Sequence, residues 1–199
     1  MSDIVTTKEK YPAGDFGVWI IIYIELVTFA MLFVGYAFSR RADVELFNQS
    51  QLMLNQTSGF INTIILITSS YFVAKAVQAV KSMDETNYKE FNKKASKWLI
   101  FALICGATFL LVKITEFSHI FGEGINLSTN KFFMFYLLLT GFHFMHVMLG
   151  SIILFNIFMR TRKFGYTPED TRGIESGASY WHMVDLLWIV LFPLIYIIR

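Results

Sequence analysis

Seven carboxyl and imidazole side chains lie inside or at the ends of long apolar segments of this 199-residue chain. They are Glu25, Glu116, His119, His143, His146, His182 and Asp185. An ionisable group is costly to bury in lipid, so each of them needs a partner or a function. Imidazoles and carboxylates are also the groups that transfer protons, bind metal ions or ligate haem iron. These residues therefore either form a reactive site or pair with one another.

Glu25 lies near the middle of the apolar sequence WIIIYIELVTFAMLF. A charge at the centre of a bilayer costs at least about 2.5 to 3.5 kcal/mol, so burial favours the neutral acid. A protonated Glu25 that is hydrogen-bonded to a neighbouring helix would help to hold a bundle together. A proton relay and a contact with a partner subunit are the functional alternatives.

Two pairs of ionisable residues have a spacing of three. His143 and His146 occur in LTGFHFMHVMLGS, and His182 and Asp185 occur in the last apolar segment. On a helix this spacing places both members of a pair on one face. The two histidines could ligate metal or haem, although helical di-metal sites also use several inward carboxylates. The alternative for His143 and His146 is a pair of hydrogen bonds to other helices. His182 could bond to Asp185, or reach across to His143 or His146.

Lys113, Glu116 and His119 follow one another at steps of three residues near the end of the third apolar segment. They share one face of a helix and can pair there. We expect a cluster at the membrane interface whose long side chains extend toward water. A site for a lipid headgroup or for a loop of a partner is the alternative.

Five apolar segments carry these residues, at 16–38, 60–80, 98–117, 132–159 and 177–198. Each has about the 20 residues that a helix needs to cross the hydrocarbon core. The chain is 55% hydrophobic, its mean hydropathy is +0.51, and only 16% of its residues are charged, against about 25% in soluble domains. The sequence therefore predicts an all-α fold, in which residues 1–199 form a single bundle of five transmembrane helices.

The charges of the connections predict the orientation of this bundle. Eleven Lys and Arg residues lie in the N-terminal segment and in the connections 81–97 and 160–176, against four on the other side. The positive-inside rule then places the N-terminus in the cytoplasm and the C-terminus outside. A net charge of +2 does not suggest a nucleic-acid partner, and the single cysteine, Cys105, excludes a disulfide within the chain.

Taken together and in order, several segments resemble subunit III of the haem–copper terminal oxidases. IYIELVTFAMLF resembles the helix with a buried carboxyl, SGFINTIILITSSYFVAKAV the Asn- and Ser-containing helix, VKITEFSHI the helix ending in glutamate, GFHFMHVMLGS the paired-histidine helix and YWHMVDLLWIVLFPLIY the closing helix. The matches run from about residue 16 to 198, so the chain is identified as a member of this family. It is similar to the five-helix forms. ESGASYWHMVDLLWIVLFPL and TNKFFMFYLLLTGFHFMHV are most similar to accessory proteins of nitric oxide reductases, with the quinol-oxidase form next.

The resemblance implies a non-catalytic subunit of the bacterial cytoplasmic (inner) membrane, with no metal, haem or other cofactor of its own. Such a subunit packs beside the catalytic subunit I, associates with phospholipid and supports proton uptake. Glu25 matches the carbodiimide-reactive carboxyl of the family. The family's shared polar residues match Glu116, His143, His146, His182 and Asp185.

Two other functions stay open at this stage. One is a membrane enzyme that binds metal or haem through His143, His146, His182 and Asp185, and a stoichiometric metal or a Soret band on the isolated chain would favour it. The other is an independent proton carrier built on Glu25, which proton flux in liposomes holding only this chain would favour.

Overall fold

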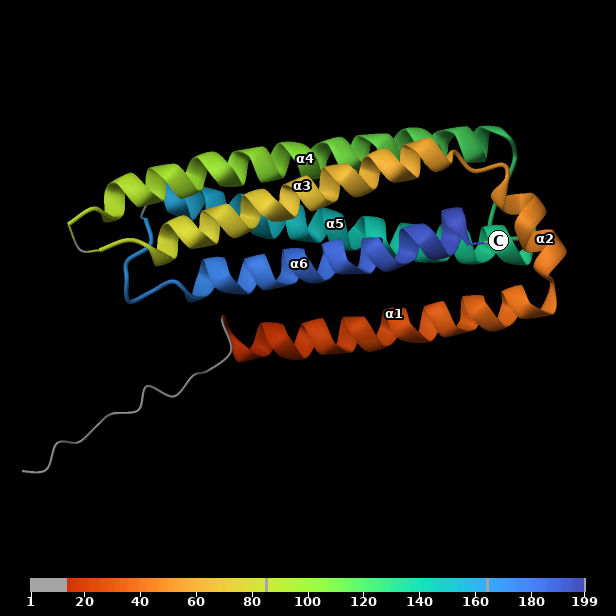
Figure 1. The fold of residues 1–199 in the computed structure, drawn as a ribbon, viewed down its shortest axis with the longest axis horizontal. Coiled ribbons are helices and arrows are strands. Elements are labelled where there is room, and N and C mark those ends of the chain that lie inside the picture. Colours follow the sequence, from red (N-terminus) through yellow and green to blue (C-terminus); the bar gives the residue numbers. More distant parts are fainter. Residues whose placement is uncertain (1–13, 85, 164, 199) are drawn as a thin grey trace, which may run out of the picture.

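The computed structural model of the protein describes residues 14–84, 86–163 and 165–198, and these residues form a helical bundle (Figure 1). The long helices are α1 (Phe16–Ala42), α3 (Gln56–Lys81), α4 (Tyr88–Gly122), α5 (Lys131–Lys163) and α6 (Arg172–Phe192). Two short elements complete it, α2 (Val44–Gln51) and the π-helical turn η1 (Pro193–Ile197). Successive long helices run in opposite directions.

Among the described residues, five helical segments of 26 to 35 residues are long and apolar enough to cross a membrane, the last being α6 continued through η1. The all-α class with five spanning helices is therefore confirmed for this part of the chain. The helices extend beyond the apolar segments that predicted them. For example, α4 begins at Tyr88 rather than near residue 98, because hydropathy marks the lipid-facing part of a helix and not its polar turns. Lys8, Lys10 and Arg199 lie outside the described residues, and the orientation of the termini stays a prediction.

The end of α6 shows how the chain accommodates a proline within a span. Pro193 has no backbone N–H, and at this residue the α-helix changes to the π-helical turn η1. Carbonyls of this turn are bonded by side chains from the polar connection after α1: Gln51 Nε2 donates to Ile195 O at 2.8 Å, and Gln56 Nε2 donates to Tyr196 O at 2.7 Å. The sequence predicted this connection as a loop, but it contains α2, whose polar residues close the end of the bundle.

Helix α1 lies at the edge of the bundle, beside α5 and α6 (Figure 1). Its buried residues are Ile22, Phe29 and Tyr36, spaced by seven residues, so only one narrow stripe packs inward. Most of the remaining surface of α1 is exposed and apolar. Such a surface requires lipid or a partner protein.

The other long helices pack more closely, and Trp181 of α6 shows why. Its indole ring, 1% exposed, lies against Gly106 of α4 and Gly150 of α5. A Cβ atom added at either glycine would lie 3.0 Å or 2.9 Å from an atom of this ring. Small residues therefore let three helices approach around one large side chain, as is typical of helix packing in membranes.

Candidate functional site

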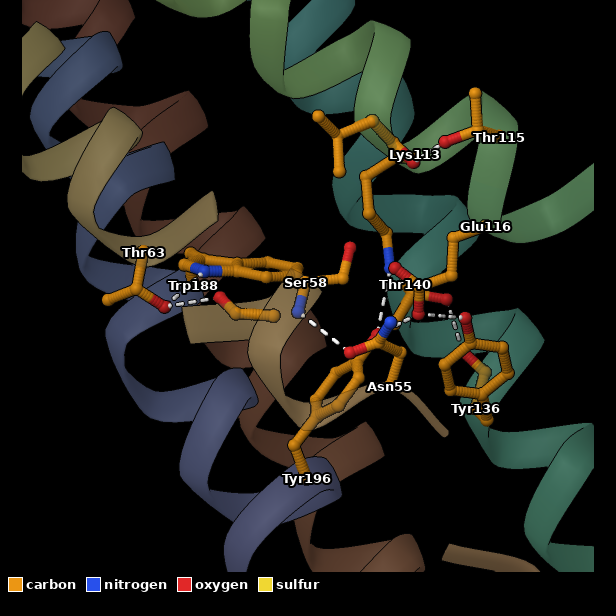
Figure 2. A network of polar contacts seen from close by, with 12 residues as sticks. Asn55, Ser58, Thr63, Lys113, Thr115, Glu116, Tyr136, Thr140, Trp188 and Tyr196 are labelled. Atoms are coloured by element: carbon orange, nitrogen blue, oxygen red, sulfur yellow. Dashed lines mark hydrogen bonds and ion pairs between the residues drawn. The ribbon is translucent and has the colours of Figure 1, made fainter. Parts of the chain in front are cut away.

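A buried ion pair connects α4, α5 and η1 at the end of the bundle that holds α2 (Figure 2). Lys113 Nζ lies 3.1 Å from Glu116 Oε2 and 2.9 Å from Tyr196 Oη. The other carboxylate oxygen, Glu116 Oε1, accepts hydrogen bonds from Tyr136 Oη at 2.7 Å and from Tyr196 Oη. The side chains of Lys113 and Glu116 are only 1% and 8% exposed. We call these four residues the Lys113 cluster.

Aromatic rings surround the ammonium group of Lys113. Its Nζ lies 5.1 to 5.6 Å from the ring centroids of Phe117, Tyr136, Trp188 and Tyr196. Cation–π attraction to these rings is strongest where water is excluded, as it is here. The expectation that Lys113 extends to the membrane surface is therefore wrong, because a carboxylate and four rings satisfy its charge inside the bundle.

A cavity of about 310 Å³ borders the Lys113 cluster near α2 and is lined in part by Glu116 and His119. His119 itself does not join the cluster. Its side chain is 73% exposed and lies 3.6 Å from Glu123. The spacing of three predicted His119 on the same face as Glu116, but in the last turns of α4 its side chain faces outward while the next residue, Ile120, is buried.

Glu25 contacts His146 across the boundary between α1 and α5. The distance from Glu25 Oε2 to His146 Nε2 is 3.1 Å, and the two side chains are 24% and 9% exposed. The other ring nitrogen, His146 Nδ1, lies 2.8 Å from Phe142 O. Since a carbonyl oxygen only accepts, Nδ1 carries a proton. The two groups then share one further proton, either on the carboxyl or on Nε2, which is an arrangement that can exchange a proton.

His182 bonds to Ser70 of α3, and not to Asp185 or to a histidine of α5 as the sequence predicted. Its Nδ1 lies 2.5 Å from Ser70 Oγ of α3. Asp185 is 8% exposed and interacts electrostatically with both Ser70 and His182, while its Oδ1 has no hydrogen-bond partner among the described residues. His182 therefore connects α6 to α3 rather than reaching the histidines of α5.

His143 is fully buried and lies among aromatic rings. The centroid of its ring is 5.1 Å from that of Trp188 and 5.8 Å from that of Phe109. Within the described part of the chain, neither of its nitrogens has a hydrogen-bond partner, and the same holds for the side-chain amide of Asn62. His143 and His146 therefore both contact the ring of Phe29, but only His146 has a polar partner among the residues described.

These positions bear on the metal-site alternative. His146 faces Glu25 of α1, His182 faces Ser70 of α3, and His143 lies between rings. Among the residues that the structure describes, no three His, Cys, Asp or Glu side chains are placed to hold a metal ion together. The arrangement can share protons within pairs and connect helices, but its four proposed ligands do not converge.

The sequence interpretation missed two residues of these contacts and did not name the partner of a third. Ser70 was expected to pack closely and to form a hydrogen bond between helices, without a named partner. Tyr136 and Tyr196 were assigned no polar role. A lysine within an apolar segment was the available signal, because such a charge requires a carboxylate and further donors or acceptors nearby. Tyr196 lies 83 residues from Lys113, so periodicity along one helix could not identify it.

Comparison with known proteins agrees with the resemblance noted from the sequence. The family model of cytochrome c oxidase subunit III matches residues 12–199. The chain is 32% identical to cytochrome c oxidase subunit 3 of Synechocystis sp. over 184 residues, which is 92% of this chain and 75% of that protein. It is 30% identical to quinol oxidase subunit 3 of Bacillus subtilis over 187 residues, 91% of this chain and 85% of that protein. The chain therefore belongs to the cytochrome c oxidase subunit III family.

Proposed function

We propose that this chain is a non-catalytic accessory subunit of a respiratory haem–copper complex in the bacterial cytoplasmic membrane. The observation that carries the proposal is the pairing inside the bundle. Lys113 pairs with Glu116, Glu25 with His146 and His182 with Ser70. These groups therefore stabilise contacts between helices instead of forming a reactive centre, and a partner must supply the redox chemistry.

The partner in this proposal is the catalytic, subunit I-like haem–copper protein. The names of the relatives, cytochrome c oxidase subunit 3 and quinol oxidase subunit 3, support a terminal oxidase. The resemblance of residues 129–147 and 175–194 to nitric oxide reductase accessory proteins supports the second candidate partner. In both cases the exposed apolar surface of α1 and its neighbours gives a membrane-embedded partner and lipid an area to cover.

Copurification tests this proposal. The chain carries an affinity tag, is expressed in its native membrane and is extracted in mild detergent. Mass spectrometry of the bound proteins is expected to identify one haem–copper catalytic subunit, and its sequence decides between an oxidase and a nitric oxide reductase. An unrelated tagged membrane protein is the control. Recovery of the chain without such a subunit, from membranes that contain one, would contradict the proposal.

The proposal also includes a role for Glu25 and His146 in proton uptake. Their shared proton lies near the middle of the span, between α1 and α5, where a carboxyl and an imidazole within hydrogen-bond reach can pass a proton on. Glu25→Gln keeps a hydrogen-bonding side chain of the same size, so we expect the complex to assemble normally and to lose proton-coupled turnover. Glu45→Gln, at an exposed residue of α2, is the matched control. If Glu25→Gln turns over at the wild-type rate at every pH, the proposed role in proton uptake is refuted, while the proposed accessory function still stands.

A further inference from the structure

A polar pocket lies between the first turns of α4 and the last turns of α5, far from the Lys113 cluster. Its volume is about 480 Å³. It lies at the end of the bundle opposite α2, which is the end that the loop charges predict to be cytoplasmic. Four cationic side chains, from Lys89, Lys93, Arg162 and Lys163, line this pocket. We call it the basic pocket.

The described residues place no carboxylate in an ion pair with the cations of the basic pocket, all four of which are exposed. By contrast, Arg160, two residues before Arg162 on α5, forms an ion pair with Asp170 at 2.5 Å. Four like charges around one cavity repel one another, so an anion that enters it is favoured.

Hydrogen bonds of a buried asparagine form one wall of the basic pocket. Asn92 Oδ1 accepts from the backbone N of Tyr166 at 2.7 Å, and Asn92 Nδ2 donates to the carbonyls of Tyr166 at 2.9 Å and Tyr88 at 2.8 Å. Gly165, which also lines the pocket, has φ +76°, and an added Cβ would lie 3.2 Å from Asn92 Nδ2. Asn92 and Gly165 therefore hold the connection after α5 against the start of α4.

Exposed apolar residues continue from the basic pocket along α4 and α5, toward the middle of these helices. Ile100 lies four residues after Ser96, a lining residue of α4, and is 42% exposed. Phe155 lies seven residues before Arg162 on α5 and is 52% exposed. Residues at these spacings share one face of a helix. A ligand with a charged head and long apolar chains would contact both the basic pocket and this apolar surface, whereas a free inorganic anion would contact only the basic pocket.

From this geometry we infer that the basic pocket binds the phosphate headgroup of an anionic phospholipid, whose acyl chains lie along the apolar surface at Ile100 and Phe155. Basic pockets between helices on the cytoplasmic side are typical sites for such headgroups. Arg162 offers a planar set of donors to phosphate oxygens, and the lysines add point charges. The site belongs to this chain alone and does not depend on which catalytic subunit accompanies it.

The test compares two double variants of the full chain, purified in mild detergent with any accompanying subunits. Lys93→Gln/Arg162→Gln removes two charges from the basic pocket. Lys94→Gln/Lys97→Gln removes two exposed charges from the same part of α4 that do not line the pocket. Native mass spectrometry measures binding of short-chain phosphatidylglycerol, with phosphatidylcholine and inorganic phosphate as the other two probes.

We expect the wild-type chain to bind phosphatidylglycerol in preference to phosphatidylcholine, and inorganic phosphate not to displace it. The pocket variant should bind it about thirtyfold more weakly, since each basic residue near a membrane contributes about a factor of five to anionic-lipid binding. The control variant should lose less than about threefold. Equal losses in the two variants would mean a diffuse surface attraction, and displacement by inorganic phosphate would mean a free-anion site. Either result would overturn the inference. An unchanged melting temperature without added lipid shows that both variants are folded.

Discussion

The Lys113 cluster predicts a specific pattern of stabilities for variants at Lys113 and Glu116. Glu116→Gln leaves an ammonium group 1% exposed, with only Tyr196 Oη and the surrounding rings as partners. Breaking a buried ion pair by removing one partner costs about 3 to 5 kcal/mol. Lys113→Met should cost less, about 1 to 3 kcal/mol, because the Glu116 carboxylate keeps two tyrosine hydroxyl donors.

The double variant Lys113→Met/Glu116→Gln distinguishes a true ion pair from two independent side chains. Because it removes both charges at once, we expect it to be more stable than Glu116→Gln alone and to lie within about 3 kcal/mol of the wild type. The interaction free energy between the two positions should then be at least about 1 kcal/mol. Reversible unfolding by SDS in bicelles, followed by near-ultraviolet circular dichroism, measures all four free energies of unfolding.

Two results would refute this reasoning. Additive costs, with the double variant the least stable of the set, would show that the charges do not compensate each other. A cost below about 1 kcal/mol for Glu116→Gln would show that water reaches the ammonium group. Lys75→Met serves as the control, because Lys75 is only half-buried, bonds to Gln78 and forms no ion pair among the described residues.

Two further variants test the helix contacts. Ser70→Ala removes the partner of His182 and should lower the free energy of unfolding by about 1 kcal/mol. Thr68→Ala, half-buried on the same helix and bonded only within it, should change this free energy by less than about 0.5 kcal/mol. Equal effects would contradict the Ser70 contact. Gly150→Ala places a Cβ against the buried ring of Trp181 and should cost about 1 to 3 kcal/mol. Gly141→Ala, with open space around it on the same helix, should stabilise by up to about 1 kcal/mol, and SDS unfolding measures both.

The sequence predicted the spanning helices well because lipid imposes a simple rule. About 20 apolar residues must occur together, and five segments meet that condition. The rule does not reach polar helical turns, so α2 and the first ten or so residues of α4 were not predicted. Tertiary contacts stabilise these parts as helices: Gln51 of α2 bonds to a carbonyl of η1, and Asn92 in the first turns of α4 bonds to the backbone of Tyr166.

The candidate site was predictable only in part, for a related reason. The cost of burying Glu25 and His146 marked each of them as a residue that needs a partner, but it did not show that they are partners of each other. Contacts between helices depend on helix rotation and register, which a single sequence does not specify. The cluster around Lys113 illustrates this, since one helix supplies Glu116 and two others supply Tyr136 and Tyr196.

The central claim is that the titratable side chains inside this bundle serve one another and not a cofactor. The most direct test is an absorption spectrum and an elemental analysis of the chain after its separation from copurified subunits. Our account predicts no Soret band and no metal in stoichiometric amount, with all haem and copper remaining in the partner fraction. One haem or metal ion per chain, lost in His143→Ala or His182→Ala, would contradict it.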